Sequence, residues 1–174
     1  MNPLAEVLQL DEIRLDVDVG DGLALLHVTA DLLGRRLGLR PADVFASLAA
    51  RETLGSTGLG HGVAIPHARM AHCKSIAGAF VRTRVAVPFD APDHKPVSLF
   101  LALVVPKEEA DRHLKILAAA AAMFGDRPFR EKLRASASPE AVRALLADWS
   151  DAPTATARDQ DPASVAAPRD SSAR

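Results

Sequence analysis

The chain has little of several features that would assign it to particular classes of protein. A single cysteine, Cys73, excludes an internal disulfide and suits a reducing cytoplasm. The formal net charge of -1 gives no overall electrostatic case for binding nucleic acid or an anionic membrane. The longest strongly apolar run, Val97 to Val105, is far too short to span a bilayer. The first residues, MNPLAEVLQLDE, have no basic and no strongly apolar region, so they do not predict a signal peptide.

What is present is the composition of one folded domain followed by a tail. Hydrophobic residues make up 48% of the 174 residues and charged residues 25%, as in ordinary globular domains. From Ser150 onward the chain has one valine and no leucine, isoleucine or aromatic residue. Such a segment buries too little to offset its ordering entropy. The sequence therefore predicts a domain over residues 1–149 and a disordered tail over 150–174 that folding does not need.

Hydrophobic periodicity predicts an α/β fold, with a mixed central sheet of about five strands flanked by helices. Strands are expected at 13–19, 63–66, 77–85 and 97–105. The last of these is almost entirely apolar, which is typical of a central strand covered on both faces. The strand at 13–19 alternates apolar and charged residues and predicts one wet face. The strand at 77–85 also alternates, with Arg82 and Arg84 partly on the side opposite Val81 and Thr83. Helices are expected at about 4–8, 25–37, 41–51, 108–124, 126–135 and 138–149. In the fourth, the predicted apolar stripe is Ala110, Leu114, Leu117, Ala121 and Phe124, with His113 at its border.

The most informative stretch is GSTGLGHGVAIPHAR, residues 55–69. Glycines at 55, 58, 60 and 62 indicate turns, and Val63 to Ile65 reads as a short buried strand. Pro66 cannot donate to a strand ladder, so we expect His67 to leave the strand and enter a loop at its carboxyl end. Ligands and chemistry gather at that edge in open α/β sheets.

This stretch resembles the active-site segment of type-2 enzyme IIA domains of the bacterial phosphoenolpyruvate phosphotransferase system. The nitrogen-regulatory branch of that family has the run G-S-T-G-[IL]-G-x-G-[IV]-A-I-P-H, whose last histidine carries the phosphoryl group. The resemblance extends from about the first strand to Trp149. It implies that His67 is phosphorylated, that His113 is the family's second active-site histidine, and that Arg51 is its active-site arginine, here in RETLGSTG.

The residues themselves suit that chemistry. A neutral imidazole is a competent nucleophile near pH 7. Phosphoryl transfer passes through a loose state whose charge sits on the outer oxygens, and these need donors. The glycine-rich turn can offer backbone N–H groups, Ser56 and Thr57 can offer hydroxyls, and Arg51 can offer a planar fork. Arg51 also lies at a helix end, where a cation stabilises the helix dipole, so a purely structural role stays open.

The resemblance also implies the partners. The donor would be a phosphohistidine protein of the HPr type, and the phosphorylation state would decide which proteins are bound, including potassium-transport or sensor proteins. We expect a cytoplasmic phosphocarrier with no cofactor, no metal, no nucleic-acid partner and no direct membrane insertion. No Walker-type loop is present, so no ATP is expected at this domain. One departure is His61, which stands where the family often has asparagine and which raises the question of how the second nitrogen of His67 is held.

Three alternatives remain open. A metal site could use His61, His67, His72 and Cys73, although their spacing matches no common zinc pattern. The domain could be a binding module in which His67 is never phosphorylated. It could also be a sugar-transport IIA that passes its phosphoryl group to a separate IIB protein. The remaining residues of this kind are expected to lie in loops or on helix surfaces without a role: His27, His72, Cys73 and His94.

Overall fold

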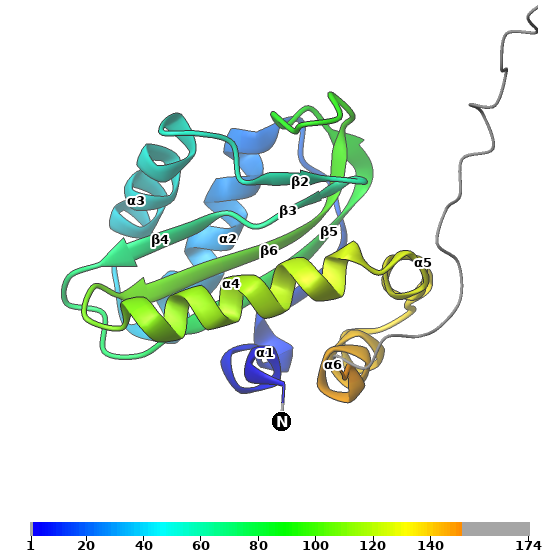
Figure 1. Cartoon of the computed structure of the whole chain (residues 1–174). Helices are drawn as coiled ribbons and strands as arrows, with labels where there is room; N and C mark the ends of the chain where they lie inside the picture. The colour runs from blue at the N-terminus through cyan, green and yellow to red at the C-terminus, as the bar shows by residue number, and fades with distance from the viewer. Residues whose placement is uncertain (1, 151–174) are drawn as a thin grey trace, which may run out of the picture.

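The structure is a computed structural model, and it describes residues 2–150 (Figure 1). The expected tail after Ser150 lies outside the described residues. The described chain forms a six-stranded mixed sheet in the order β1-β5-β6-β3-β2, with β4 also pairing with β6. The strands are β1 Ile13–Val17, β2 Gly58–Gly60, β3 Val63–Ala64, β4 His67–Met70, β5 Ala77–Val87 and β6 Val97–Pro106. The predicted α/β class with a mixed sheet flanked by helices is confirmed.

Helices cover both faces of the sheet. One face packs on α2 Gly22–Leu37 and α3 Pro41–Thr53, and the other on α1 Pro3–Val7, α4 Ala110–Gly125, α5 Arg127–Ala135 and α6 Pro139–Asp148. A short 3-10 turn, η1 Leu10–Glu12, precedes β1. Local signals begin and end these helices: the side chains of Asn2, Asp21 and Ser138 cap α1, α2 and α6, and Gly38 in the left-handed conformation ends α2.

The central strand of the sheet is β6. It runs antiparallel to β5 and parallel to both β3 and β4, and nine of its ten residues are buried. The prediction of a central strand at 97–105 is therefore confirmed. In β5, Ala77 to Thr83 are buried on both faces and only Arg84 to Ala86 are exposed. Residues of α1 and α2 pack against this strand.

The stripe predicted for α4 is wrong by about one residue. The buried residues of α4 are His113, Ile116, Ala120, Met123 and Phe124, whereas Leu114 is 65% exposed. The run of alanines from 118 to 122 fits more than one helical face, so periodicity alone did not fix the orientation. The consequence is functional, because the buried face carries His113 inward toward the sheet.

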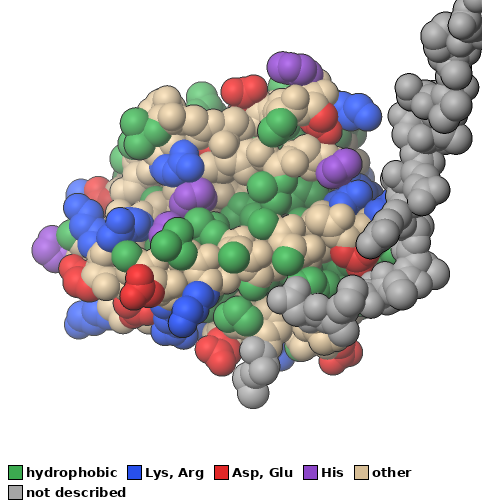
Figure 2. All heavy atoms as spheres, in the orientation of Figure 1, with side chains coloured by type: hydrophobic (Ala, Val, Ile, Leu, Met, Phe, Trp, Pro, Cys, Tyr) green, Lys and Arg blue, Asp and Glu red, His purple; other side chains and the backbone are tan. Residues whose placement is uncertain are grey.

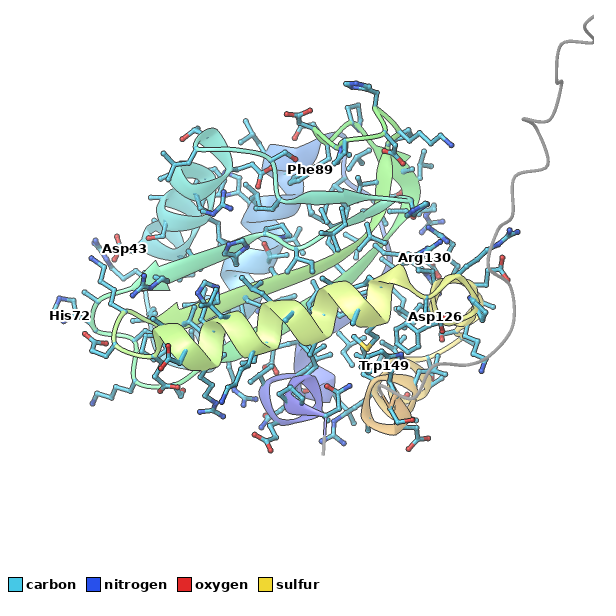
Figure 3. All side chains as sticks on the ribbon, viewed as in Figure 1. Asp43, His72, Phe89, Asp126, Arg130 and Trp149 are labelled. Atoms are coloured by element: carbon cyan, nitrogen blue, oxygen red, sulfur yellow. The ribbon has the colours of Figure 1, made fainter. Side chains whose placement is uncertain are left out.

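Arg82 and Arg130 form hydrogen bonds with backbone carbonyls at the ends of α5 and α4. Arg82 of β5 is 9% exposed, and it binds the carboxylate of Asp16 and the carbonyl oxygens of Leu133, Arg134 and Ser136 at 2.7–3.1 Å. Arg130, which projects from α5 toward the end of α4 in Figure 3, donates to the carbonyls of Phe124 and Gly125. These contacts satisfy the free carbonyls at two helix ends.

Candidate functional site

Three elements that are distant in sequence bring Arg51, His67 and His113 together. Arg51 lies in the last turn of α3, His67 is the first residue of β4, and His113 lies in the first turn of α4. The sequence predicted that His67 enters a loop, and this prediction is wrong, because His67 begins β4. Pro66 interrupts only its own N–H position, and its carbonyl accepts from Leu103 N–H at 2.8 Å. The chain then resumes pairing, with His67 opposite Leu103 in β6.

The two ring nitrogens of His67 have different partners. Nδ1 lies 2.8 Å from the carbonyl oxygen of Ile65. A carbonyl can only accept, so Nδ1 carries the proton and the neutral ring has its lone pair on Nε2. The Nε–H of Arg51 donates to that Nε2 atom at 3.3 Å. The nitrogen that faces the arginine is therefore the one able to react.

His113 lies against His67 from the opposite side of the site. The two ring centroids are 5.2 Å apart with an interplanar angle of 62°. His113 is 7% exposed, and its Nε2 atom has no hydrogen-bond partner within residues 2–150. An unpartnered buried ring nitrogen is costly unless a ligand completes it. The atom is thus available to a group bound beside His67.

Both imidazoles are kept neutral by their surroundings. Burial lowers the pKa of His67 below its ordinary value, and the charge of Arg51 adds to this, while the Ile65 carbonyl and Glu52 oppose it. Burial also lowers the pKa of His113, helped by His67, Arg69 and Arg51. Near pH 7 both rings are therefore uncharged, which preserves the lone pair on His67.

Ser56 and Thr57 attach the glycine-rich loop to neighbouring residues through hydrogen bonds. The hydroxyl of Ser56 donates to the carbonyl of Asp90 and accepts from Gly58 N–H. Thr57 is 6% exposed, and its N–H and hydroxyl both donate to the carboxylate of Glu52, at 3.0 and 2.6 Å. Gly58 allows this close approach, since a Cβ there would lie 2.5 Å from the Asp90 oxygen.

Sequence reasoning missed three groups at the site. The Ile65 carbonyl is a backbone atom and leaves no mark in the sequence. Glu52 follows Arg51 directly in RETLGSTG, a signal that was present but given no role. Arg69 is exposed, and by strand alternation it shares a face of β4 with His67. Its charge reaches His113, as the lowered pKa of that ring reflects.

The question about His61 is answered by the backbone. His61 lies in the turn between β2 and β3, where its N–H donates to Asp93 and its carbonyl accepts from Arg134. The second nitrogen of His67 is held by Ile65, not by the residue at position 61. Within residues 2–150 no group of three or more His, Cys, Asp or Glu side chains could hold a metal ion.

The other histidines and Cys73 lie apart from this site. His72 projects outward at the edge of the molecule in Figure 3, and the His27 ring stacks on Phe45 with centroids 3.7 Å apart. His94 lies in the segment between β5 and β6. Cys73 lies in the loop between β4 and β5, where it is buried and its thiol donates to the carbonyl of Ser75.

The surface beside the site is apolar. Figure 2 shows hydrophobic side chains gathered over α4 next to histidine, lysine and arginine side chains on the same face. Leu114, adjacent to His113, is among the large exposed hydrophobic residues. Exposed apolar side chains of this kind beside a histidine pair suit contact with another protein. No helix within residues 2–150 has the length and apolar character needed to cross a membrane.

Comparisons with known proteins show the family and the fold of the chain. The model of the family "Phosphoenolpyruvate-dependent sugar phosphotransferase system, EIIA 2" matches residues 6–149. A nitrogen regulatory protein of Pseudomonas aeruginosa is 36% identical over 146 residues, which cover 83% of this chain and 95% of that protein. A crystal structure of nitrogen regulatory protein IIA-Ntr from Neisseria meningitidis superposes with a TM-score of 0.80 at 50% identity, covering 82% of this chain and 97% of the other. Enzyme IIA of the mannitol system of Escherichia coli shares the fold, at 20% identity and a TM-score of 0.67 with 79% and 97% coverage.

Proposed function

The chain belongs to the EIIA 2 family of the phosphoenolpyruvate-dependent sugar phosphotransferase system, and on that premise we propose that His67 accepts a phosphoryl group on Nε2 from a phosphohistidine carrier of the HPr type. The observation that carries the proposal is the tautomer of His67. The Ile65 carbonyl holds the proton on Nδ1, which leaves the Nε2 lone pair facing Arg51.

The transfer needs no proton movement at this residue. The Nε2 lone pair attacks phosphorus, a P–N bond to His67 forms, and the P–N bond to the donor imidazole breaks with its electron pair returning to the donor nitrogen. The phosphoryl oxygens carry the charge. Arg51 supplies N–H donors to them, and the unpartnered Nε2 of His113 can donate when that nitrogen carries the proton. Ser56 and Thr57 act through the loop that holds these groups in place.

The proposal extends to regulation. Phosphorylation adds charge beside the apolar surface of α4, and such a change alters which proteins can dock there. Relatives of the chain carry the name nitrogen regulatory protein, which supports a regulatory role in the nitrogen branch. The proposed targets are potassium-transport or sensor proteins, and the proposed compartment is the cytoplasm, because a single cysteine suits a reducing environment.

Intact-mass measurement after incubation with phosphorylated carrier tests the first step. One added phosphoryl group is expected on the wild type and none on His67→Ala, and peptide mapping should place the group on His67. His113→Ala should still accept the group but should pass it on or lose it at an altered rate. Phosphate on His113 or Ser56, with His67 unmodified, would overturn the assignment.

Two further outcomes separate the alternatives. A folded wild type that never gains mass would favour a binding module without phosphorylation. Rapid onward transfer to a cysteine of a separate IIB protein would favour a sugar-transport role instead.

A further inference from the structure

Two neighbouring residues at the end of α3 act on the two nitrogens of the same ring. Arg51 contacts Nε2 of His67 directly, at 3.3 Å. Glu52 reaches the other nitrogen through a chain of hydrogen bonds. Its carboxylate accepts from Thr57, the carbonyl of Thr57 accepts from Ile65 N–H at 3.0 Å, and the carbonyl of Ile65 accepts from Nδ1–H of His67 at 2.8 Å.

We propose that Glu52 is a positioning residue for His67: through Thr57 and Ile65 it fixes the carbonyl that holds the Nδ1–H tautomer, and so leaves Nε2 free to react. The inference rests on the proposed phosphoryl transfer at His67 and names a further residue for it. Glu52 does not touch the phosphoryl group in this arrangement. It acts on the geometry of the nucleophile.

Glu52 holds Thr57 by two hydrogen bonds. Both carboxylate oxygens are used, and both bonds go to one residue, Thr57. Hydrogen bonds to an ionised carboxylate are short and strong, which the 2.6 Å contact to the hydroxyl reflects. Thr57 and Ile65 are buried at 6% and 4% exposure, so neither can exchange these partners for water. Displacing Thr57 therefore displaces the Ile65 segment that faces His67.

The charge of Glu52 also bears on the ring. Glu52 raises the pKa of His67 and so opposes the lowering by burial and by Arg51. The charged groups around the ring are Arg51 and Glu52 from α3, while His113 of α4 is the other titratable group. A change that keeps the shape of Glu52 but removes its charge separates these two effects from each other.

Three variants and one control test the proposal by two readouts. Glu52→Ala removes the anchor, Glu52→Gln keeps the shape without the charge, and Thr57→Val removes one of the two donors while keeping the backbone bond. Thr53→Ala is the matched control, because its exposed hydroxyl bonds only the α3 carbonyl of Ala50 and lies one residue from Glu52. The readouts are the imidazole nitrogen shifts of His67 by NMR and the single-turnover rate of phosphorylation by the carrier.

The wild type should show a protonated Nδ1 and a free Nε2. Glu52→Ala should shift the ring toward the other tautomer and slow phosphorylation about tenfold, with Thr57→Val intermediate. Glu52→Gln should restore the tautomer and most of the rate, and Thr53→Ala should match the wild type. Folded Glu52→Ala with unchanged nitrogen shifts and rate would overturn the proposal. If Glu52→Ala does not fold, wild-type nitrogen shifts and a wild-type rate in Thr57→Val would overturn the proposal equally.

The two readouts also keep this inference apart from the proposed function. A wild type that takes no phosphoryl group contradicts the transfer at His67, whereas the nitrogen shifts still decide whether Glu52 positions the ring.

Discussion

The Nε–H group of Arg51 donates to the Nε2 atom of His67 across 3.3 Å, so the guanidinium lies beside the nitrogen that we propose accepts the phosphoryl group. Arg51 is also attached to the loop, because its Nη1 donates to the carbonyl of Gly55 at 2.9 Å. If Nε2 carried a phosphoryl group, the N–H groups of Arg51 would donate to the phosphoryl oxygens instead of to the imidazole ring. The same side chain then serves the free and the phosphorylated forms.

Arg51→Ala is predicted to slow phosphorylation while leaving stability nearly unchanged. Hydrogen bonds to charged groups are worth about 1.5–3 kcal/mol, which corresponds to a rate lower by roughly tenfold to a hundredfold. The contribution of Arg51 to its helix end is smaller, at about 0.3–1 kcal/mol. Single-turnover phosphorylation and urea unfolding measure the two effects. Arg51→Lys keeps the charge but not the planar guanidinium, so its phosphorylation rate should lie between those of the wild type and Arg51→Ala. If Arg51→Ala is unstable but still phosphorylated at the wild-type rate, Arg51 has a structural role instead.

The lowered pKa values of His67 and His113 predict how stability depends on pH. Both groups bind protons more weakly when folded than when unfolded, where the ordinary value is 6.5. Below about pH 6.5 the unfolded state therefore takes up more protons, and the free energy of unfolding falls by up to about 1.4 kcal/mol per pH unit for each ring. The contribution of the two neutral rings to the free energy of unfolding is fully present above about pH 6.5 and is lost as the pH falls below it.

Urea unfolding between pH 7.5 and 5.5 measures this dependence against a His67→Gln, His113→Gln double variant. The wild type should lose more stability than the variant over this range, since acidic side chains are common to both. Equal losses would mean that the two rings titrate normally in the folded protein.

Gly58→Ala is predicted to destabilise the domain by about 1–3 kcal/mol, because the added methyl would overlap backbone atoms. Its Cβ would lie 2.5 Å from the oxygen of Asp90 and 2.9 Å from Cα of Ala91. The loop carrying Thr57 would move, so phosphorylation should slow as well. Gly20→Ala is the control, since a Cβ there meets nothing within 4 Å. Thermal unfolding should show a lower melting temperature for Gly58→Ala and little change for Gly20→Ala.

Arg82→Met is predicted to cost about 3 kcal/mol of stability, because it leaves the carbonyls of Leu133, Arg134 and Ser136 without their donor. Arg84→Met is the matched control on the same strand. Arg84 pairs with Asp18 in an exposed position, at 64% and 73% side-chain exposure, and such pairs are worth about 0–1 kcal/mol. Equal losses in the two variants, measured by urea unfolding, would contradict the anchoring role of Arg82.

Much of the fold was predictable because its signals are local. The apolar run from Val97 to Val105 identified the central strand, which the structure extends to Pro106. β4 was missed because Pro66 reads as the end of a strand, whereas a parallel neighbour still pairs with the residues beyond it. β2 was missed because Gly58 and Gly60 have low strand propensity, and its pairing with β3 comes from the tertiary structure.

The site was predictable in its residue types but not in its arrangement. The motif around His67 led to the proposal that this histidine reacts, and His113 was placed beside it only through the family resemblance. No periodicity in the alanine-rich α4 showed that its buried face carries His113 and leaves Leu114 outside. The tautomer of His67 depends on a backbone oxygen at Ile65, which no side-chain pattern reports.

The pairing of β4 with β6 has a consequence for the protein as it leaves the ribosome. Among the strands within residues 2–150, β4 pairs only with β6, and His67 lies opposite Leu103. While only the residues before Val97 have been synthesised, β4 has no strand to join, so His67 has no fixed orientation. α4 follows β6 directly and delivers His113 next. Because such non-local pairings form slowly and late, we expect a nascent or truncated chain that ends before β6 to contain residues 55–69 without the arrangement described around His67.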